Sequence, residues 1–211
     1  MKRQVAATIL VLALATLACG QASKVMSDVA ETLEATTVEA PEVSEATAKP
    51  AATAKPVATA KPLGGDSISQ WATSAVASSE YDASDWSAMQ ATGAPDTSEC
   101  GDQTTAWASA TAGTEEWIEL TYDTLVFPTQ VNIYQTYYPN QVVKVELIDN
   151  ASVYHIVYTG EPESIEQCPY ILSIPVKDAD YLVAGVRITI DQSQIGNWNE
   201  IDAVELVGVA E

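Results

Sequence analysis

Histidine, phenylalanine and basic residues are scarce in this 211-residue sequence, and these scarcities exclude several kinds of chemistry. The single histidine, His155, leaves no set of His and Cys ligands at the short spacing of a zinc site. A serine triad would need the same histidine as its base, and no nucleophile-elbow motif accompanies it. Glycine-rich phosphate-binding loops are also missing from the sequence. We therefore predict that the protein is not an enzyme.

Acidic residues are abundant, so two of them close together do not indicate a glycosidase. Pairs such as Glu115 with Glu116, and Glu161 with Glu163, lie in polar, loop-like stretches. A two-carboxylate mechanism needs one acid held in an apolar pocket and a second acid facing it across a cleft. We interpret these pairs as chance neighbours in an acidic chain.

The net charge of −20 is carried by the C-terminal part of the chain. Residues 66–211 contain 23 Asp and Glu but only three basic residues, Lys144, Lys177 and Arg187. Such an acidic surface repels phosphate backbones and anionic lipids, which argues against nucleic acid as a partner. It favours calcium, neutral polyols or basic partners, although acidity can also serve only to keep an exposed protein soluble.

The N-terminus has the features of a signal peptide. Two basic residues precede an apolar run, residues 5–17, that is shorter than the roughly 20 residues needed to span a bilayer. The small and apolar residues that lead into Cys19 resemble the bacterial lipobox. The resemblance implies that residues 1–19 are a lipoprotein signal peptide and that Cys19 is diacylated. The protein would then be extracytoplasmic and anchored to the bacterial cell envelope by lipid alone, the alternative being ordinary secretion.

The segment 20–65 contains no aromatic residue and is dominated by Ala, Thr, Glu, Val, Pro and Lys. This composition cannot build a hydrophobic core. The unit Ala-Thr-Ala-Lys-Pro occurs three times, at 46–50, 52–56 and 58–62, which is typical of an extended spacer. We predict a disordered stalk over 20–65 and a single folded domain over 66–211, where every tryptophan and tyrosine lies.

The sequence contains three cysteines, and lipidation would occupy one of them, Cys19. Cys100 and Cys168 remain, and in an exported protein such a pair predicts a disulfide. Closing so long a loop would stabilise the fold by about 2–4 kcal/mol.

The folded domain shows the period-two hydrophobic pattern of half-buried β-strands, most clearly at 143–147 and 186–190. Only residues 83–91 have the composition for a helical turn. Eight or nine short strands predict an all-β, antiparallel sandwich. The other predicted strands are 70–77, 104–110, 116–122, 130–135, 152–158, 170–176 and 201–207.

Four motifs of this domain, taken in order, resemble the galactose-binding-like jelly roll, the superfamily of discoidin and coagulation-factor type C domains. The resemblance covers about residues 69–208 and implies an eight-to-nine-stranded jelly-roll sandwich with a binding function. The motifs are Ala-Ser-Ser at 77–79, Trp86 followed by Ala-Thr-Gly-Ala-Pro-Asp at 91–96, the aromatic stretch 134–140, and Glu-Ile-Asp-Ala-Val-Glu-Leu at 200–206.

The resemblance also implies a structural calcium where the first long loop meets the last strand. The matching residues are Asp96 in the loop and Glu200 or Asp202 in the closing strand. Calcium takes six to eight oxygen ligands, and Gly93 and Pro95 would turn loop carbonyls toward one point. The alternative is that Asp96 caps a turn while the other two acids are solvated.

Ligands of the superfamily bind on loops at one end of the sandwich, where aromatic rings stack on sugar faces and amides bond the hydroxyls. Two of the candidates, Trp86 and Trp198, could instead be core residues. The histidine and arginine site of fucose-binding members is not transferred, because His155 and Arg187 lie in predicted strands. The candidate ligand-binding residues are Tyr81, Trp86, Tyr137, Tyr138, Asn140, Asn197 and Trp198.

Together these features predict a surface-displayed, non-catalytic binding module stabilised by calcium, with a glycan or polysaccharide as its partner. A protein-interaction module of an envelope or secreted assembly is the alternative, since fold does not fix the ligand. A third interpretation is that the domain is only a spacer.

Overall fold

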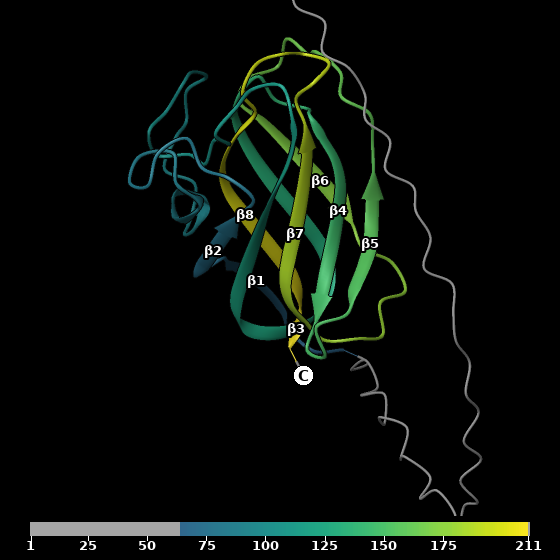
Figure 1. Cartoon of the computed structure of the whole chain (residues 1–211). Coiled ribbons are helices and arrows are strands. Elements are labelled where there is room, and N and C mark those ends of the chain that lie inside the picture. Colours follow the sequence, from purple (N-terminus) through teal and green to yellow (C-terminus); the bar gives the residue numbers. More distant parts are fainter. Residues whose placement is uncertain (1–63, 211) are drawn as a thin grey trace, which may run out of the picture. The chain divides into compact units, whose positions relative to one another are not determined.

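Eight β-strands and one short 3₁₀ helix make up residues 64–210, the part of the chain that the computed structural model describes (Figure 1). No helix among these residues is long and apolar enough to cross a membrane. The predicted signal peptide with Cys19 and almost all of the predicted stalk lie outside them. The strands are β1 (Ser67–Trp71), β2 (Ser74–Ala77), β3 (Glu115–Tyr137), β4 (Val142–Asp149), β5 (Tyr154–Thr159), β6 (Tyr170–Pro175), β7 (Val183–Asp191) and β8 (Glu200–Ala210), with the 3₁₀ helix η1 at Ala88–Ala91.

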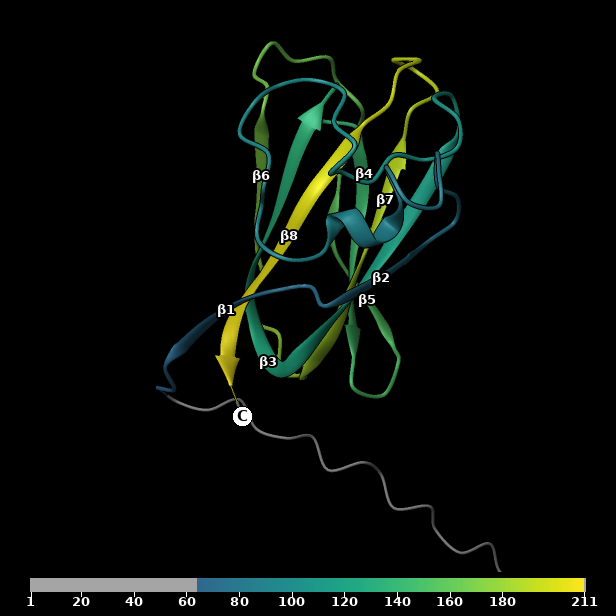
Figure 2. The same ribbon diagram turned by 90° about the vertical axis from the view of Figure 1, so that its left-hand side faces the viewer.

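The long strand β3 joins the two layers of the sandwich. Its first part, 115–121, pairs with β2 and β7, whereas its second part, 130–135, pairs with β6 and β8. The register shifts between Thr121 and Val126, and Figure 2 shows the sharp bend that β3 makes. One layer is therefore β2, β3, β7, β4 and β5, and the other is β1, β8, β3 and β6, all antiparallel. This confirms the predicted antiparallel jelly-roll sandwich.

The core lies between the layers and follows the alternation seen in the sequence. On β7, Val186, Ile188 and Ile190 are fully buried, while Arg187 between them is half-exposed. Ile118 of β3 faces the same core. Burying each such side chain stabilises the fold by about 1.5–3 kcal/mol.

Four predicted strands differ in the structure. Residues 116–122 and 130–135 belong to one strand. Pro128 between them has no backbone N–H to donate to a neighbouring strand, and a bulge at this point lets the strand continue. The predicted strand 70–77 divides into β1 and β2, which pair in different layers. The prediction of a strand at 104–110 is wrong, because these residues make only the isolated bridge of Trp107 with Ile201.

The buried residues around Trp107 explain why the sequence of residues 104–110 resembles that of a strand. The ring of Trp107 is fully buried, and its Nε1–H donates to the carbonyl of Ser79 at 3.1 Å. The run of small buried residues around it is a loop packed on the core, with η1 as the predicted helical turn nearby.

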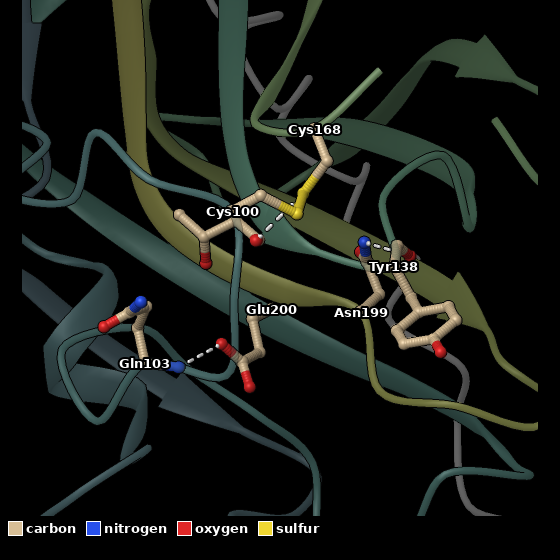
Figure 3. Close-up of a disulfide and its surroundings, with 7 residues drawn as sticks. Cys100, Gln103, Tyr138, Cys168, Asn199 and Glu200 are labelled. Atoms are coloured by element: carbon tan, nitrogen blue, oxygen red, sulfur yellow. Dashed lines mark hydrogen bonds between the residues drawn. A yellow bond between two sulfur atoms is a disulfide. The ribbon is translucent and has the colours of Figure 1, made fainter. Parts of the chain in front are cut away.

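The predicted disulfide between Cys100 and Cys168 is present, which confirms that pairing (Figure 3). It links the long loop after η1 to the segment before β6, two regions 68 residues apart in sequence. The bridge thus ties the loop that carries Asp102 to the second layer of the sandwich.

Candidate functional site

A small cavity among the loops at the start of β8 brings three of the predicted aromatic residues together. Its volume is about 70 Å³. The ring centroid of Tyr81 lies 5.3 Å from that of Trp86 and 5.7 Å from that of Trp198, and both pairs are edge-to-face. We call the three rings the aromatic cage. The full lining of the cavity is Tyr81, Trp86, Asp102, Ala108, Trp198 and Glu200.

Hydrogen bonds fix both tryptophan rings of the cage. The Trp86 Nε1–H donates to the Asp102 carboxylate at 3.0 Å, and the Trp198 Nε1–H donates to the Ser109 carbonyl at 2.9 Å. Trp86 has a φ of 53°, a left-handed backbone that a bulky residue rarely adopts and that commonly marks functional sites. Both rings are half-exposed, so Trp86 and Trp198 are not core residues. The tryptophan that is buried in the core of this region is Trp107.

Glu200 forms the acidic wall of the cavity at the first position of β8. It is only 1% exposed, and its Oε2 accepts the backbone N–H of Gln103 at 2.9 Å (Figure 3). Burial, with the neighbouring Asp102 carboxylate adding to it, raises the pKa of Glu200 to about 8. Its carboxyl group is therefore mostly protonated at neutral pH.

Tyr137 ends β3 beside the acidic wall, and Tyr138 follows it in the next loop. Tyr137 pairs in register with Glu200, and burial followed by nearby charge, including that of Asp102, raises the pKa of its phenol. The two tyrosine rings meet edge-to-face at 4.7 Å, and Tyr138 is 42% exposed. The Tyr138 carbonyl is held by the Asn199 side-chain amide at 3.2 Å (Figure 3). An accessible aromatic surface thus adjoins the cavity.

The two predicted asparagines use their amides within the protein. The Asn140 Nδ2 donates to the Glu163 carbonyl at 3.1 Å, and its backbone N–H donates to the Gln135 side chain. The Asn197 Oδ1 accepts the Trp198 backbone N–H at 3.1 Å. These contacts shape the loops that carry the aromatic residues.

The three predicted calcium ligands divide between two places. Asp202 lies under the loop of Asp96, where its Oδ2 accepts the Thr97 N–H at 3.4 Å and its Oδ1 is buried without a hydrogen-bond partner. Burial and then the adjacent Asp96 raise the pKa of Asp202 to about 6. Glu200 instead pairs with Asp102. Within residues 64–210, no three acidic, His or Cys side chains gather closely enough to hold a metal ion.

A wider cavity of about 430 Å³ extends from the Asp96 and Asp202 pair. Tyr134 and Tyr170, together with Gln167, contribute to its lining. No sequence motif predicted a role in binding for these residues or for Asp102. Asp102 follows Cys100 by two positions, so the predicted disulfide was the one signal that could have pointed to it.

His155 and Arg187 line neither of these cavities. The Arg187 guanidinium lies 3.9 Å from the ring centroid of Trp117 and 3.5 Å from a carboxylate oxygen of Glu119. His155 bonds Asp149 at 2.9 Å. Both residues lie on strands, as predicted, and have partners within the protein.

The domain has the jelly-roll fold that the resemblance to galactose-binding-like domains implied. Residues 63–211 match the family model described as Pappalysin-1, SD scarf domain, C-terminal, and the chain belongs to that family.

Solved structures with a similar fold come from several bacteria. A variant of chitosan-binding module 1 from the chitosanase/glucanase of Paenibacillus sp. IK-5 is 18% identical, with a TM-score of 0.50 over 64% of this chain and 93% of that one. The family 32 CBM of C. perfringens NanJ, in complex with galactose, is 16% identical, with a TM-score of 0.49 over 66% and 99%. The F5/8 type C domain of a Bacteroides fragilis protein is 16% identical, with a TM-score of 0.49 over 67% and 93%. At these identities the likeness concerns the fold.

Proposed function

We propose that this domain is a non-catalytic carbohydrate-binding module whose ligand occupies the aromatic cage and the neighbouring Tyr138 surface. The observation that carries the proposal is the convergence of Tyr81, Trp86 and Trp198 on one cavity beside an exposed tyrosine. Flat aromatic faces stack on the C–H side of sugar rings, while carboxyl oxygens accept hydrogen bonds from hydroxyl groups. The site supplies both kinds of contact.

The described functions of similar folds support this assignment. The Paenibacillus domain is a chitosan-binding module, and the C. perfringens domain was solved with galactose. Concave, mostly apolar sites with a few convergent polar groups are the usual form of small-molecule sites.

The arrangement of the acids supports binding without catalysis. A glycosidase holds its two carboxyl groups about 5–9.5 Å apart on either side of the scissile bond. Asp102 and Glu200 are instead direct neighbours, close enough for Asp102 to raise the pKa of Glu200. They leave no gap for a glycosidic bond between them.

We also propose that Asp96 and Asp202 bind a calcium ion together with carbonyls of the loop around Thr97. The unpartnered, buried Oδ1 of Asp202 and the adjacent Asp96 are the hard oxygen donors that calcium prefers. A cation there would relieve the repulsion that raises the pKa of Asp202. Its role would be to hold the loop against β8.

We propose further that the domain is displayed outside the cytoplasm through a lipid on Cys19. The disulfide between Cys100 and Cys168 supports an oxidising compartment. Metabolic labelling with palmitate, lost in Cys19→Ser, tests the anchor, and an unlabelled wild-type chain would contradict it.

The alternative function, protein interaction, has one supporting observation. The edge strand β5 exposes Tyr154 and Ile156, which are 43% and 61% accessible, next to the equally apolar Val153. Exposed sheet edges with apolar side chains are common binding surfaces for other chains.

Calorimetric titration of the full chain in detergent with a panel of soluble oligosaccharides tests the carbohydrate proposal. We expect saturable binding of at least one saccharide, and Tyr138→Ala should weaken it about tenfold, as loss of an aromatic anchor does. Tyr154→Ala is the matched control, because that tyrosine is equally exposed but lies on β5. If no saccharide binds to the folded protein, the proposal is wrong and the β5 edge becomes the better candidate.

A further inference from the structure

Four fully buried side-chain amides connect the loops around the aromatic cage. An amide taken out of water destabilises the fold unless its hydrogen bonds are replaced, so each of them needs partners within the protein. The Asn199 Nδ2–H donates to the Gln135 Oε1 at 2.9 Å, which anchors the group on β3. We call the four residues the amide cluster, and its members are Gln135, Gln141, Gln192 and Asn199.

The amide cluster holds the backbone of Tyr138 through two hydrogen bonds. The Tyr138 carbonyl accepts the Gln141 Nε2–H at 2.8 Å and the Asn199 Nδ2–H at 3.2 Å, the second of which Figure 3 shows. Tyr138 has a φ of 33°, a left-handed conformation that a bulky residue rarely adopts. Such a conformation persists only where the surrounding contacts enforce it. The two amide bonds therefore help to fix the direction in which the Tyr138 side chain leaves the loop.

The same cluster fixes the backbone on both sides of Trp198. The Asn197 carbonyl, just before Trp198, accepts a second hydrogen bond from the Gln141 Nε2 at 3.1 Å. Asn199 lies just after Trp198, and its backbone N–H donates to the Gln192 Oε1 at 2.8 Å. Because Gln141 also bonds the Tyr138 carbonyl, the positions of Tyr138 and Trp198 are linked through one side chain.

The cluster also reaches the ring of Trp198, through Ser109. The Gln192 Nε2 donates to the Ser109 Oγ at 2.7 Å and to the Thr111 carbonyl at 3.2 Å. The Ser109 carbonyl in turn accepts the Trp198 Nε1–H. The cluster thereby joins the loop between β2 and β3 to the loops on either side of it, those that carry Tyr138 and Trp198.

We propose that the amide cluster holds the binding site in the arrangement that accepts a ligand, and that Gln141, Gln192 and Asn199 are its positioning residues. Their side chains are fully buried and do not line the cavity of the cage, so they act through Tyr138 and Trp198. This inference rests on the proposed carbohydrate-binding function and assigns further residues to it. Without the cluster the loops populate other conformations, and the apparent affinity falls in proportion to the fraction of molecules in which the site is assembled.

Gln141→Met tests the inference, because it keeps the length of the side chain and removes its donor. It should weaken binding of the tightest-binding saccharide of the oligosaccharide panel about tenfold, as expected if the site is assembled in about one molecule in ten. Every weaker saccharide should lose affinity by the same factor, since a positioning residue changes how often the site is assembled and not what it contacts. Calorimetric titration of the full chain in detergent measures these affinities. Gln192→Met is the second variant, with the same expected result, and decides the test if Gln141→Met does not fold.

Gln70→Met is the matched control for a loss of stability alone. In β1, the Gln70 Nε2 donates to the Thr124 carbonyl at 2.7 Å and its Oε1 accepts the Thr124 N–H at 3.1 Å. The same substitution therefore also removes side-chain bonds to a backbone, but Gln70 and Thr124 line neither the cavity of the cage nor the wider one. Gln70→Met should leave saccharide binding unchanged, even where its Tm falls as far as that of Gln141→Met.

A measurement without ligand tests the cluster independently of any saccharide. In the free protein, Gln141→Met should shift or broaden the ¹H–¹⁵N signal of the Trp198 indole, because the Asn197 carbonyl loses its hydrogen bond. The signal of Trp117, which lies against Arg187, should stay in place. Gln70→Met should leave both signals unchanged.

The outcomes separate this inference from the proposed function. If Gln141→Met binds every saccharide as the wild type does, if it changes their ranking, or if Gln70→Met weakens binding equally, the positioning inference is wrong while carbohydrate binding stands. If no saccharide binds to the wild type, the proposed function fails and the Trp198 signal decides. A shift in Gln141→Met then retains the positioning role of the cluster, and an unchanged signal overturns it.

Discussion

Glu200 carries a buried carboxyl group at the start of β8, with Asp102 beside it. Its pKa of about 8 lies above the ordinary value of 4.5, because burial disfavours the charged form. The folded protein therefore holds this proton between about pH 4.5 and pH 8, where the unfolded chain has released it. By linkage, the contribution of Glu200 to stability is complete below that window and is lost as the pH rises through it.

Glu200→Gln should remove this pH dependence, because an amide does not titrate. The amide stays neutral and can still accept the Gln103 N–H, so the variant should gain stability relative to wild type as the pH rises from about 5 to about 8. Thermal melting of both proteins in chelator across this range measures the difference. A difference in Tm that stays constant with pH would show that Glu200 is not held protonated by the fold.

Single residues also show what the sequence could and could not predict. The aromatic residues of the cage were identified as candidates, because loops rich in Trp and Tyr stand out from a period-two pattern. Asp102 was not identified, because nothing in the sequence sets it apart from the other acids among the 23 in the domain. Its position beside the buried Glu200 is visible only in the structure. The grouping of Asp96 with Asp202, separate from Glu200, likewise depends on side-chain directions that the sequence does not give.

At the scale of elements, alternation predicted β4 and β7 well because each has one face in the core. It failed at 104–110, where buried residues follow one another in a loop. It also divided β3, because Pro128 is usually a strand breaker and only the neighbouring bulge makes it compatible with the sheet. Bulges and layer changes depend on long-range pairing, which a local pattern does not encode.

Calcium should act at the scale of the loop that carries Asp96 and the strand β8 that carries Asp202. We expect added calcium to raise the Tm at about pH 7.5 and to have little effect at about pH 5, below the raised pKa of Asp202, since calcium ligands must be deprotonated. Melting curves with calcium and with chelator measure this effect.

Asp202→Asn should abolish the calcium response, whereas Asp180→Asn, an exposed acid between β6 and β7, should retain it. A wild-type Tm that is the same in calcium and in chelator at about pH 7.5 would contradict the proposed site.

In the whole molecule, the sandwich brings the long loop between β2 and β3 and the start of β8 together around one cavity. The two layers share β3, and the disulfide links the loop of Asp102 to the segment before β6. Such a scaffold fixes the cage before any ligand arrives, which lowers the entropic cost of binding. The acidic surface then favours cationic ligands over anionic ones.

Two-dimensional ¹H–¹⁵N NMR of the five tryptophan indoles is the most direct test of the proposed binding site. Titration with the tightest-binding saccharide should shift the Nε1–H signals of Trp86 and Trp198, because their rings form the cage. The signal of Trp117, which lies against Arg187, should stay in place. Shifts confined to Trp117, with Trp86 and Trp198 unchanged, would place the ligand elsewhere and contradict the account.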